Sequence, residues 1–312
     1  MNSHSFQTPP APALWRTDMA CHLDRLRQAR APIFYRLEGR AALHKCFETP
    51  ADTLNEDAKR VKLIEASVSL VVERSAGTFA GRGSKRAAAA LRLADKLAVG
   101  VETGTPQPTL GSSVYMRRLR ADMITALLDA AAHYADINLR TVTVINRKWR
   151  FTARQLRKVT AAQIKRQFRT HLQRAGILDE PGFLVAFLHG EYEPTTGVFQ
   201  LHYHVLTTAE KADLLLSRLR GRQGYERTAT GAVPIKRCKI ENRPKQFSYL
   251  LKSFWPERPV VTIDGVEKRV RANRRIKGKF HTLHLQWLNR CSLADIMVIN
   301  NCVFRNGKFH GC

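Results

Sequence analysis

Apolar residues recur at two different spacings along the chain, and the change between them separates the predicted helices from the predicted strands. Spacings of three and four residues place side chains on one face of a helix, and they occur over residues 14–30, 55–73 and 84–99. A stretch at 100–113 contains Gly, Thr and two prolines and predicts a loop or linker. Helical spacing returns over 114–134, so the first part of the chain is predicted to be helical.

Alternation of apolar and polar residues, which is typical of strands, begins after this helical part. Residues 140–145 alternate β-branched side chains. Two β-rich runs at 183–193 and 198–207 are joined by Pro194-Thr-Thr-Gly197 and predict a hairpin. A further strand is predicted at about 233–240.

Helices are predicted between and after these strands. Ile164, Phe168 and Leu172 recur every four residues and predict an amphipathic helix with a basic outer face. Other helices are predicted at 209–220, 243–254 and 281–290, and a second hairpin, with an Asp-Gly turn, at 260–270.

These elements predict an α+β fold, in which a central antiparallel sheet of about five strands carries helices on one face and N-terminal helices are added to it. The opposite face of the sheet is left for a site. Four segments are expected: a disordered leader at 1–13, an accessory helical region at 14–110, a principal domain at 111–258, and a basic hairpin with a C-terminal extension at 259–312.

The charge of the chain indicates a polyanionic partner. There are 52 Lys and Arg residues against 26 Asp and Glu, a formal net charge of +26, and nucleic acid is the first candidate for such a chain. No apolar run is long enough to span a bilayer and the N-terminus lacks a secretory pattern, so no membrane partner and a cytoplasmic location are expected. The six cysteines include no C-x-x-C pair and are expected to be free thiols; Cys21, His22, His44 and Cys46 form the one grouping of metal-ligand type, without a known zinc spacing.

A basic run provides the candidate contacts to nucleic acid. Residues 146–178 contain no acidic residue, which favours phosphate contact over a merely solvated face. The residues expected to bind nucleic acid are Arg147, Lys148, Arg150, Arg154, Lys165 and Arg169, together with Lys245 farther along the chain.

Two histidines in the segment Gln200-Leu-His-Tyr-His-Val-Leu206 are candidate metal ligands. His202 and His204 stand two apart on a predicted strand and therefore share a face, while Tyr203 points to the other. The partner strand of the hairpin carries Glu191 and Glu193 on one face, and a carboxylate from it would complete a site for Mg²⁺ or Mn²⁺. The alternative is a half-exposed pair of histidines on a solvated sheet face.

Tyr249 and Lys252 are candidate catalytic residues. They lie three apart on a predicted helix, where side chains are neighbours. A lysine beside a tyrosine favours the phenolate and neutralises charge on an attacked phosphate. The alternative is a core tyrosine with a lysine that reaches solvent.

The order of these features resembles the three-motif pattern of the His-hydrophobic-His (HUH) endonuclease superfamily, in particular rolling-circle replication initiators of the single-tyrosine type. The resemblance covers roughly residues 140–254. It implies that His202 and His204 are metal ligands and that Glu191 or Glu193 is the third. It also implies that Tyr249 is the nucleophile and Lys252 its helper. Lys245 occupies the position, one helical turn before Tyr249, at which two-tyrosine members carry their other nucleophile.

This resemblance implies an HUH-type nuclease domain at 111–258 and an enzyme that nicks one DNA strand. The expected product is a 5′-phosphotyrosine intermediate that initiates rolling-circle replication at a single-stranded or hairpin origin, with Mg²⁺ or Mn²⁺ as cofactor and host replication proteins as possible partners. Two alternatives stay open: a transposase or mobilisation relaxase with the same nicking core, and a non-catalytic basic protein that binds nucleic acid.

Overall fold

The computed structural model describes residues 47–312 apart from 76–79, 228–232, 253, 264 and 271–273. The predicted leader at 1–13, the predicted helix at 14–30 and the grouping of Cys21, His22, His44 and Cys46 lie outside the described residues.

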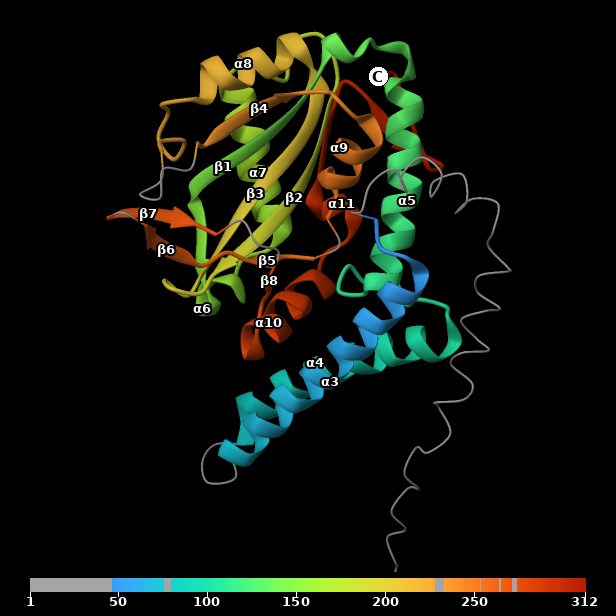
Figure 1. The fold of residues 1–312 in the computed structure, drawn as a ribbon, viewed down its shortest axis with the longest axis vertical. Coiled ribbons are helices and arrows are strands. Elements are labelled where there is room, and N and C mark those ends of the chain that lie inside the picture. Colours follow the sequence, from blue (N-terminus) through green and yellow to red (C-terminus); the bar gives the residue numbers. More distant parts are fainter. Residues whose placement is uncertain (1–46, 76–79, 228–232, 253, 264, 271–273) are drawn as a thin grey trace, which may run out of the picture.

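Three helices open the described part of the chain, as the apolar spacing predicts. They are α3 (Pro50–Ser75), α4 (Ala80–Thr103) and α5 (Ser113–Ala130). The first two pack along each other and form the elongated lower part of the molecule (Figure 1). Their contact has a core of its own, in which Ile64 of α3 and Leu93 of α4 are fully buried together with Leu285 from near the end of the chain.

A buried carboxylate connects these helices to the remainder of the fold. Asp57 on α3 accepts hydrogen bonds from Ser112 Oγ (2.6 Å) and from the backbone N–H of Ser113 (2.6 Å) at the start of α5. The first N–H groups of a helix have no partner within the helix, so Asp57 satisfies donors that burial would otherwise leave unpaired. The N-terminal helices are thus fixed to the body of the protein by a polar contact as well as by apolar packing.

The centre of the fold is a seven-stranded, mostly antiparallel sheet. Its strands are β1 (Leu139–Thr152), β2 (Leu184–Glu193), β3 (Val198–Thr208), β4 (Ile235–Lys239), β5 (Pro256–Glu257), β8 (Arg274–Arg275) and β9 (Met297–Asn300). Five of them form a continuous antiparallel array in the order β4-β1-β3-β2-β9. The short strands β5 and β8 continue from the other end of β2, and β5 runs parallel to β2.

The helices that connect these strands are α6 (Ala153–Leu156), α7 (Ala161–Arg174), α8 (Ala209–Leu219) and α9 (Arg243–Leu250), followed by α10 (Gly278–Asn289) and α11 (Leu293–Ile296). Two short 3-10 turns, Ala131–His133 and Asp136–Asn138, precede β1. The order β1-α7-β2-β3-α8-β4 with the strand arrangement β4-β1-β3-β2 is a split β-α-β unit. The chain therefore has an α+β fold, and its C-terminal part contributes β9 to the same sheet.

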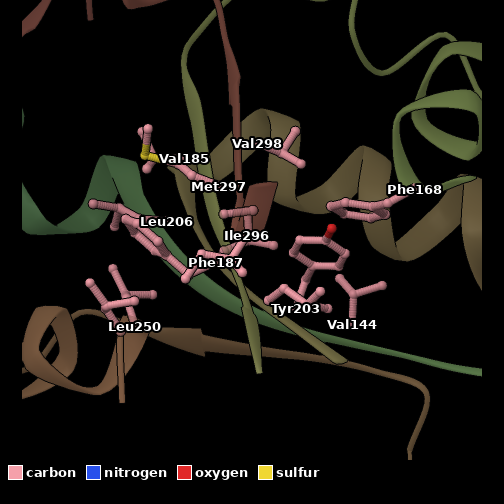
Figure 2. Packing of buried hydrophobic residues seen from close by; sticks show 14 of the residues in the cluster. Val144, Phe168, Val185, Phe187, Tyr203, Leu206, Leu250, Ile296, Met297 and Val298 are labelled. Atoms are coloured by element: carbon pink, nitrogen blue, oxygen red, sulfur yellow. The ribbon is translucent and has the colours of Figure 1, made fainter. Parts of the chain in front are cut away.

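Helices cover both faces of the sheet, so the prediction of helices on one face is wrong. On one face, Phe168 of α7 stacks on Tyr203 of β3 with 4.3 Å between ring centroids. On the other, Leu250 of α9 lies toward Phe187 and Leu206 (Figure 2). Both faces of β2 and β3 carry large apolar side chains that must be buried, and the alternation that the sequence shows in β1 does not extend to these central strands.

Two small hairpins lie outside the main sheet. The predicted hairpin at 260–270 is present as β6 (Val260–Ile263) and β7 (Val266–Arg269), with Gly265 in the turn at φ +73°. The second hairpin consists of β10 (Val303–Arg305) and β11 (Lys308–His310).

None of the helices in the described part of the chain combines the length and apolar character needed to cross a membrane.

Candidate functional site

Three histidines share one face of the sheet, which we call the histidine face. In the antiparallel register, His202 on β3 lies opposite His189 on β2, and His204 lies opposite Phe187 on β2 and Thr143 on β1. Directly opposite residues of an antiparallel pair project to the same side. The predicted common face of His202 and His204 is therefore present, and it also includes His189.

The two imidazoles of the H-Y-H segment converge on one point. The Nε2 atoms of His202 and His204 are 3.2 Å apart. Two nitrogens that bind one cation at about 2.1 Å each are about 3.0–3.4 Å apart for bond angles between octahedral and tetrahedral. His204 Nδ1 lies 3.1 Å from Thr143 Oγ1, and a hydrogen bond donated by Nδ1–H leaves Nε2 free as a lone-pair donor.

His189 completes a cluster of three rings. Its ring centroid is 4.8 Å from that of His204 and 6.0 Å from that of His202. Its Nε2 lies 2.5 Å from the carbonyl oxygen of Leu250, at the end of α9, and donates a hydrogen bond to it. This bond places the end of α9 directly over the histidine cluster.

Burial keeps all three imidazoles neutral near pH 7. It lowers the pKa of His202 to about 4, although Glu191 acts in the opposite direction. Burial likewise lowers the pKa values of His189 and His204 well below the ordinary value, with neighbouring cationic groups acting in the same direction. A neutral imidazole is the form that binds a metal ion.

Tyr249 and Lys252 lie beside this cluster. The Tyr249 ring is 4.8 Å from the His204 ring, centroid to centroid, and its side chain is 51% exposed. The Nζ atom of Lys252 lies 3.8 Å from the centroid of the Tyr249 ring. The predicted adjacency of the two residues is therefore present on the histidine face.

The helix that carries Tyr249 is shorter than predicted. It ends at Leu250, followed by Leu251 in an extended conformation (φ −120°), so Lys252 lies beyond the helix. The chain must leave the helix there because Pro256–Glu257 pair with β2 as strand β5. Trp255 packs so closely over Gly190 of β2 that a Cβ atom at position 190 would lie 2.5 Å from its ring.

The cationic surroundings of the site change the pKa of Lys252. Burial lowers this pKa to about 8, with the positive charges of Arg258 and Arg120 acting in the same direction and Glu191 against them. Burial raises the pKa of the Tyr249 phenol, against the effect of Arg258. The phenol is therefore protonated near neutral pH, and a fraction of the Lys252 amines is neutral.

The predicted carboxylate ligands are engaged elsewhere. Glu191 lies on the histidine face, but its carboxylate is hydrogen-bonded to Arg269 and lies 3.9 Å from Arg258 Nε. Glu193 accepts hydrogen bonds from the backbone N–H groups of Thr195 (2.7 Å) and Thr196 (3.1 Å) in the β2–β3 turn. The arginines that hold Glu191 come from a later part of the chain, whereas the threonines that hold Glu193 lie in the adjacent turn. Over the described residues, no group of three or more His, Cys, Asp or Glu side chains is arranged to hold a metal ion.

The predicted nucleic-acid residues are divided between the two faces of the sheet. Arg150 lies opposite Gln200 of β3 and so shares the histidine face. Lys165 and Arg169 lie on α7, against the opposite face, and donate to the backbone oxygens of Ala294 (2.7 Å) and Ile299 (3.2 Å).

The other four predicted contacts are exposed. Arg147 and Lys148 lie in an irregular part of β1 between Ile145 and Arg150, near Glu226 and Gln223 respectively. Arg154 lies on α6. Lys245 lies on α9, four residues before Tyr249 and thus on the same side of the helix.

Lys236 is a further basic residue on the histidine face. It pairs with Thr143, which in turn pairs with His204, and it is exposed. Along this part of β1, Thr143 and Ile145 are partly exposed, whereas Val144 between them is buried. The histidine face is therefore accessible over β1 and β4. The sequence contains Lys236 in a predicted strand, but only the strand pairing places it beside the histidines.

No family model, curated protein or solved structure is significantly similar to this chain.

Proposed function

We propose that this chain is a DNA strand transferase of the HUH type, which nicks a single strand through a tyrosine nucleophile and thereby initiates rolling-circle replication. The observation that carries the proposal is the juxtaposition of the Tyr249 ring with His204 at 4.8 Å, beside two imidazole nitrogens 3.2 Å apart. These groups come from β3 and from a helix more than forty residues later, and they meet on one face of the sheet.

Two of the ligands that a divalent cation would need are already close together. His202 and His204 would hold it through their Nε2 atoms, which are unprotonated when both imidazoles bind a metal ion. His189 Nε2 is engaged by the Leu250 carbonyl, so the third ligand would be Glu191, after its release from Arg269. A bound Mg²⁺ or Mn²⁺ would polarise a non-bridging oxygen of the scissile phosphate.

The protein's own residues supply the nucleophile and a route for its proton. The Tyr249 oxygen attacks the phosphorus, forming a tyrosyl–phosphate bond to the 5′ side as the bond to the 3′-oxygen breaks. The phenolic proton passes to the neutral amine of Lys252, and the leaving 3′-oxygen takes up a proton from solvent water, so that a free 3′-hydroxyl results. Lys252 then carries a positive charge beside the phosphate.

The surface around the site is suited to an unpaired strand. Arg150 and Lys236 lie on the accessible part of the histidine face and would contact phosphates. The five-stranded antiparallel array and the split β-α-β order further support an HUH-like, RRM-like domain. A transposase or mobilisation relaxase would use the same chemistry.

The test is formation of a covalent adduct. Purified protein is incubated with a pool of random-sequence single-stranded oligonucleotides and Mn²⁺, and the products are separated under denaturing conditions. We expect a protein–DNA adduct on the peptide that contains Tyr249, and none with EDTA or in Tyr249→Phe. Tyr192→Phe, on the opposite face of β2, is the matched control. DNA binding without an adduct in the wild type would leave only a basic nucleic-acid-binding protein.

A further inference from the structure

The β6–β7 hairpin is separate from the packed body of the protein. Among the described elements, β6 and β7 have extensive contacts only with each other. The hairpin extends outward from the sheet beyond the end of β5 (Figure 1). A two-stranded hairpin is marginally stable alone, so packing within the body does not account for its shape.

One face of this hairpin presents apolar side chains to solvent. Val261 is 37% exposed and Ile263 is 46% exposed. The two residues stand two apart on β6 and therefore share a face. Lys268 lies directly opposite Val261 on β7 and is exposed on that same face. The hairpin thus combines exposed β-branched side chains with an adjacent positive charge.

The base of the hairpin is attached to the candidate site. Arg258 precedes β6 and Arg269 ends β7, and both arginines approach the carboxylate of Glu191 on the histidine face. The backbone N–H of Arg258 also donates to the carbonyl of Tyr192 on β2 (2.7 Å). These contacts fix the base of the hairpin beside the histidine cluster.

We propose that the β6–β7 hairpin is a strand-separating wedge that inserts Val261 and Ile263 at the end of a DNA duplex next to the nicking site. The inference rests on the proposed function. Apolar side chains inserted between base steps unstack them, and Lys268 would contact the adjacent phosphate. The net charge of +26 and the position of Lys268 on the apolar face favour a duplex arm of the DNA substrate as the occupant of that face. The wedge would deliver an unpaired strand to Tyr249.

The test uses the double variant Val261→Ser/Ile263→Ser in the full chain. Val303→Ser is the matched control, because Val303 is 51% exposed on the other small hairpin. Adduct formation is measured on random-sequence single-stranded oligonucleotides and on the same pool in which each oligonucleotide is annealed to its complement. We expect the double variant to form the adduct at the wild-type rate on single strands and at least tenfold more slowly on duplex. Val303→Ser should react at the wild-type rate on both substrates.

A second measurement separates this proposal from the nicking chemistry. In a Tyr249→Phe background, a DNA stem with 2-aminopurine near its end is titrated with protein, and the rise in fluorescence reports base-pair opening. We expect the fluorescence to rise with Tyr249→Phe, in which the hairpin is intact. With Val261→Ser/Ile263→Ser added, the rise should be at most a tenth as large. Equal opening by both proteins would overturn the wedge, whereas failure of the wild type to form an adduct would overturn the nicking proposal and leave this measurement decisive for the hairpin.

Discussion

Arg269 donates a hydrogen bond to the carboxylate of Glu191, 78 positions earlier in the chain. The carboxylate expected to approach the histidines is thereby held by the base of the β6–β7 hairpin. If a cation binds at the candidate site, this ion pair would couple its binding to the position of that hairpin.

Removing the charge at position 269 tests this link. We expect Arg269→Met to release Glu191 toward the histidines and to tighten Mn²⁺ binding at least about threefold, measured by calorimetry, because an opposing ion pair no longer competes for the carboxylate. The double variant Arg269→Met/Glu191→Gln should lose this gain. An unchanged dissociation constant in Arg269→Met would show that Glu191 only anchors the hairpin and that the third ligand comes from elsewhere.

The paired imidazoles should dominate cation binding. His202→Ala and His204→Ala each remove one of the two converging Nε2 atoms, and we expect a loss of Mn²⁺ affinity of at least about 100-fold, comparable to or larger than the effect of removing a residue that only orients a ligand. His133→Ala, an exposed histidine before β1, is the control. Equal affinity in all three variants would be incompatible with a metal site here.

The proposed adduct reaction should depend on pH through Lys252. With a pKa of about 8, its amine becomes increasingly neutral as pH rises, and a neutral amine accepts the phenolic proton. The initial rate should therefore rise from pH 7 and level off above pH 8 to 9. Lys252→Arg keeps the charge but cannot accept a proton in this range, and it should lower the plateau rate by about 100-fold and abolish the rise. The same profile in both proteins would exclude Lys252 as the proton acceptor.

A second pair of buried histidines makes the stability of the fold pH-dependent. On α10, burial lowers the pKa of His281 to about 4, with Arg60 and Arg275 acting in the same direction and Glu56 against them. Burial also lowers the pKa of the adjacent His284.

Because the folded pKa of His281 lies below its unfolded value, its contribution to stability is complete above about pH 6.5 and is lost as pH falls toward 4. For His281 the loss is about 2 kcal/mol by pH 5. We expect urea unfolding of the wild type to show a steeper decrease in the free energy of unfolding between pH 7.5 and 5 than that of His281→Leu. Parallel curves would contradict the buried neutral state of His281.

The two faces of the sheet should contribute differently to single-strand binding. Arg150→Ala and Lys236→Ala remove positive charge from the histidine face, and each should reduce the slope of log affinity against log salt by about 0.7 for a single-stranded oligonucleotide. Arg169→Ala, on α7 against the other face, should leave the slope unchanged. If Arg169→Ala reduced the slope more than the other two variants, the single-stranded DNA would bind to the α7 face instead.

The sequence alone determined the elements and the faces of local segments. Two β-rich runs and the Pro194–Gly197 turn predicted the β2–β3 hairpin, and the period of two in a strand placed His202 and His204 on one face with Tyr203 on the other. These features follow from the backbone geometry of a few consecutive residues, so they depend only on the local sequence. The overall positive charge is likewise a property of composition.

Only the tertiary structure decided which residues surround those histidines. The pairing of β4 with β1 brings Lys236 beside Thr143, the return of the chain as β5 ends α9 before Lys252, and Arg269 engages Glu191. Each of these contacts joins segments far apart in the chain. Local periodicity gives the side of a strand on which a residue lies, but the free energy of pairing, burial and ion-pair competition depends on neighbours that only folding brings together.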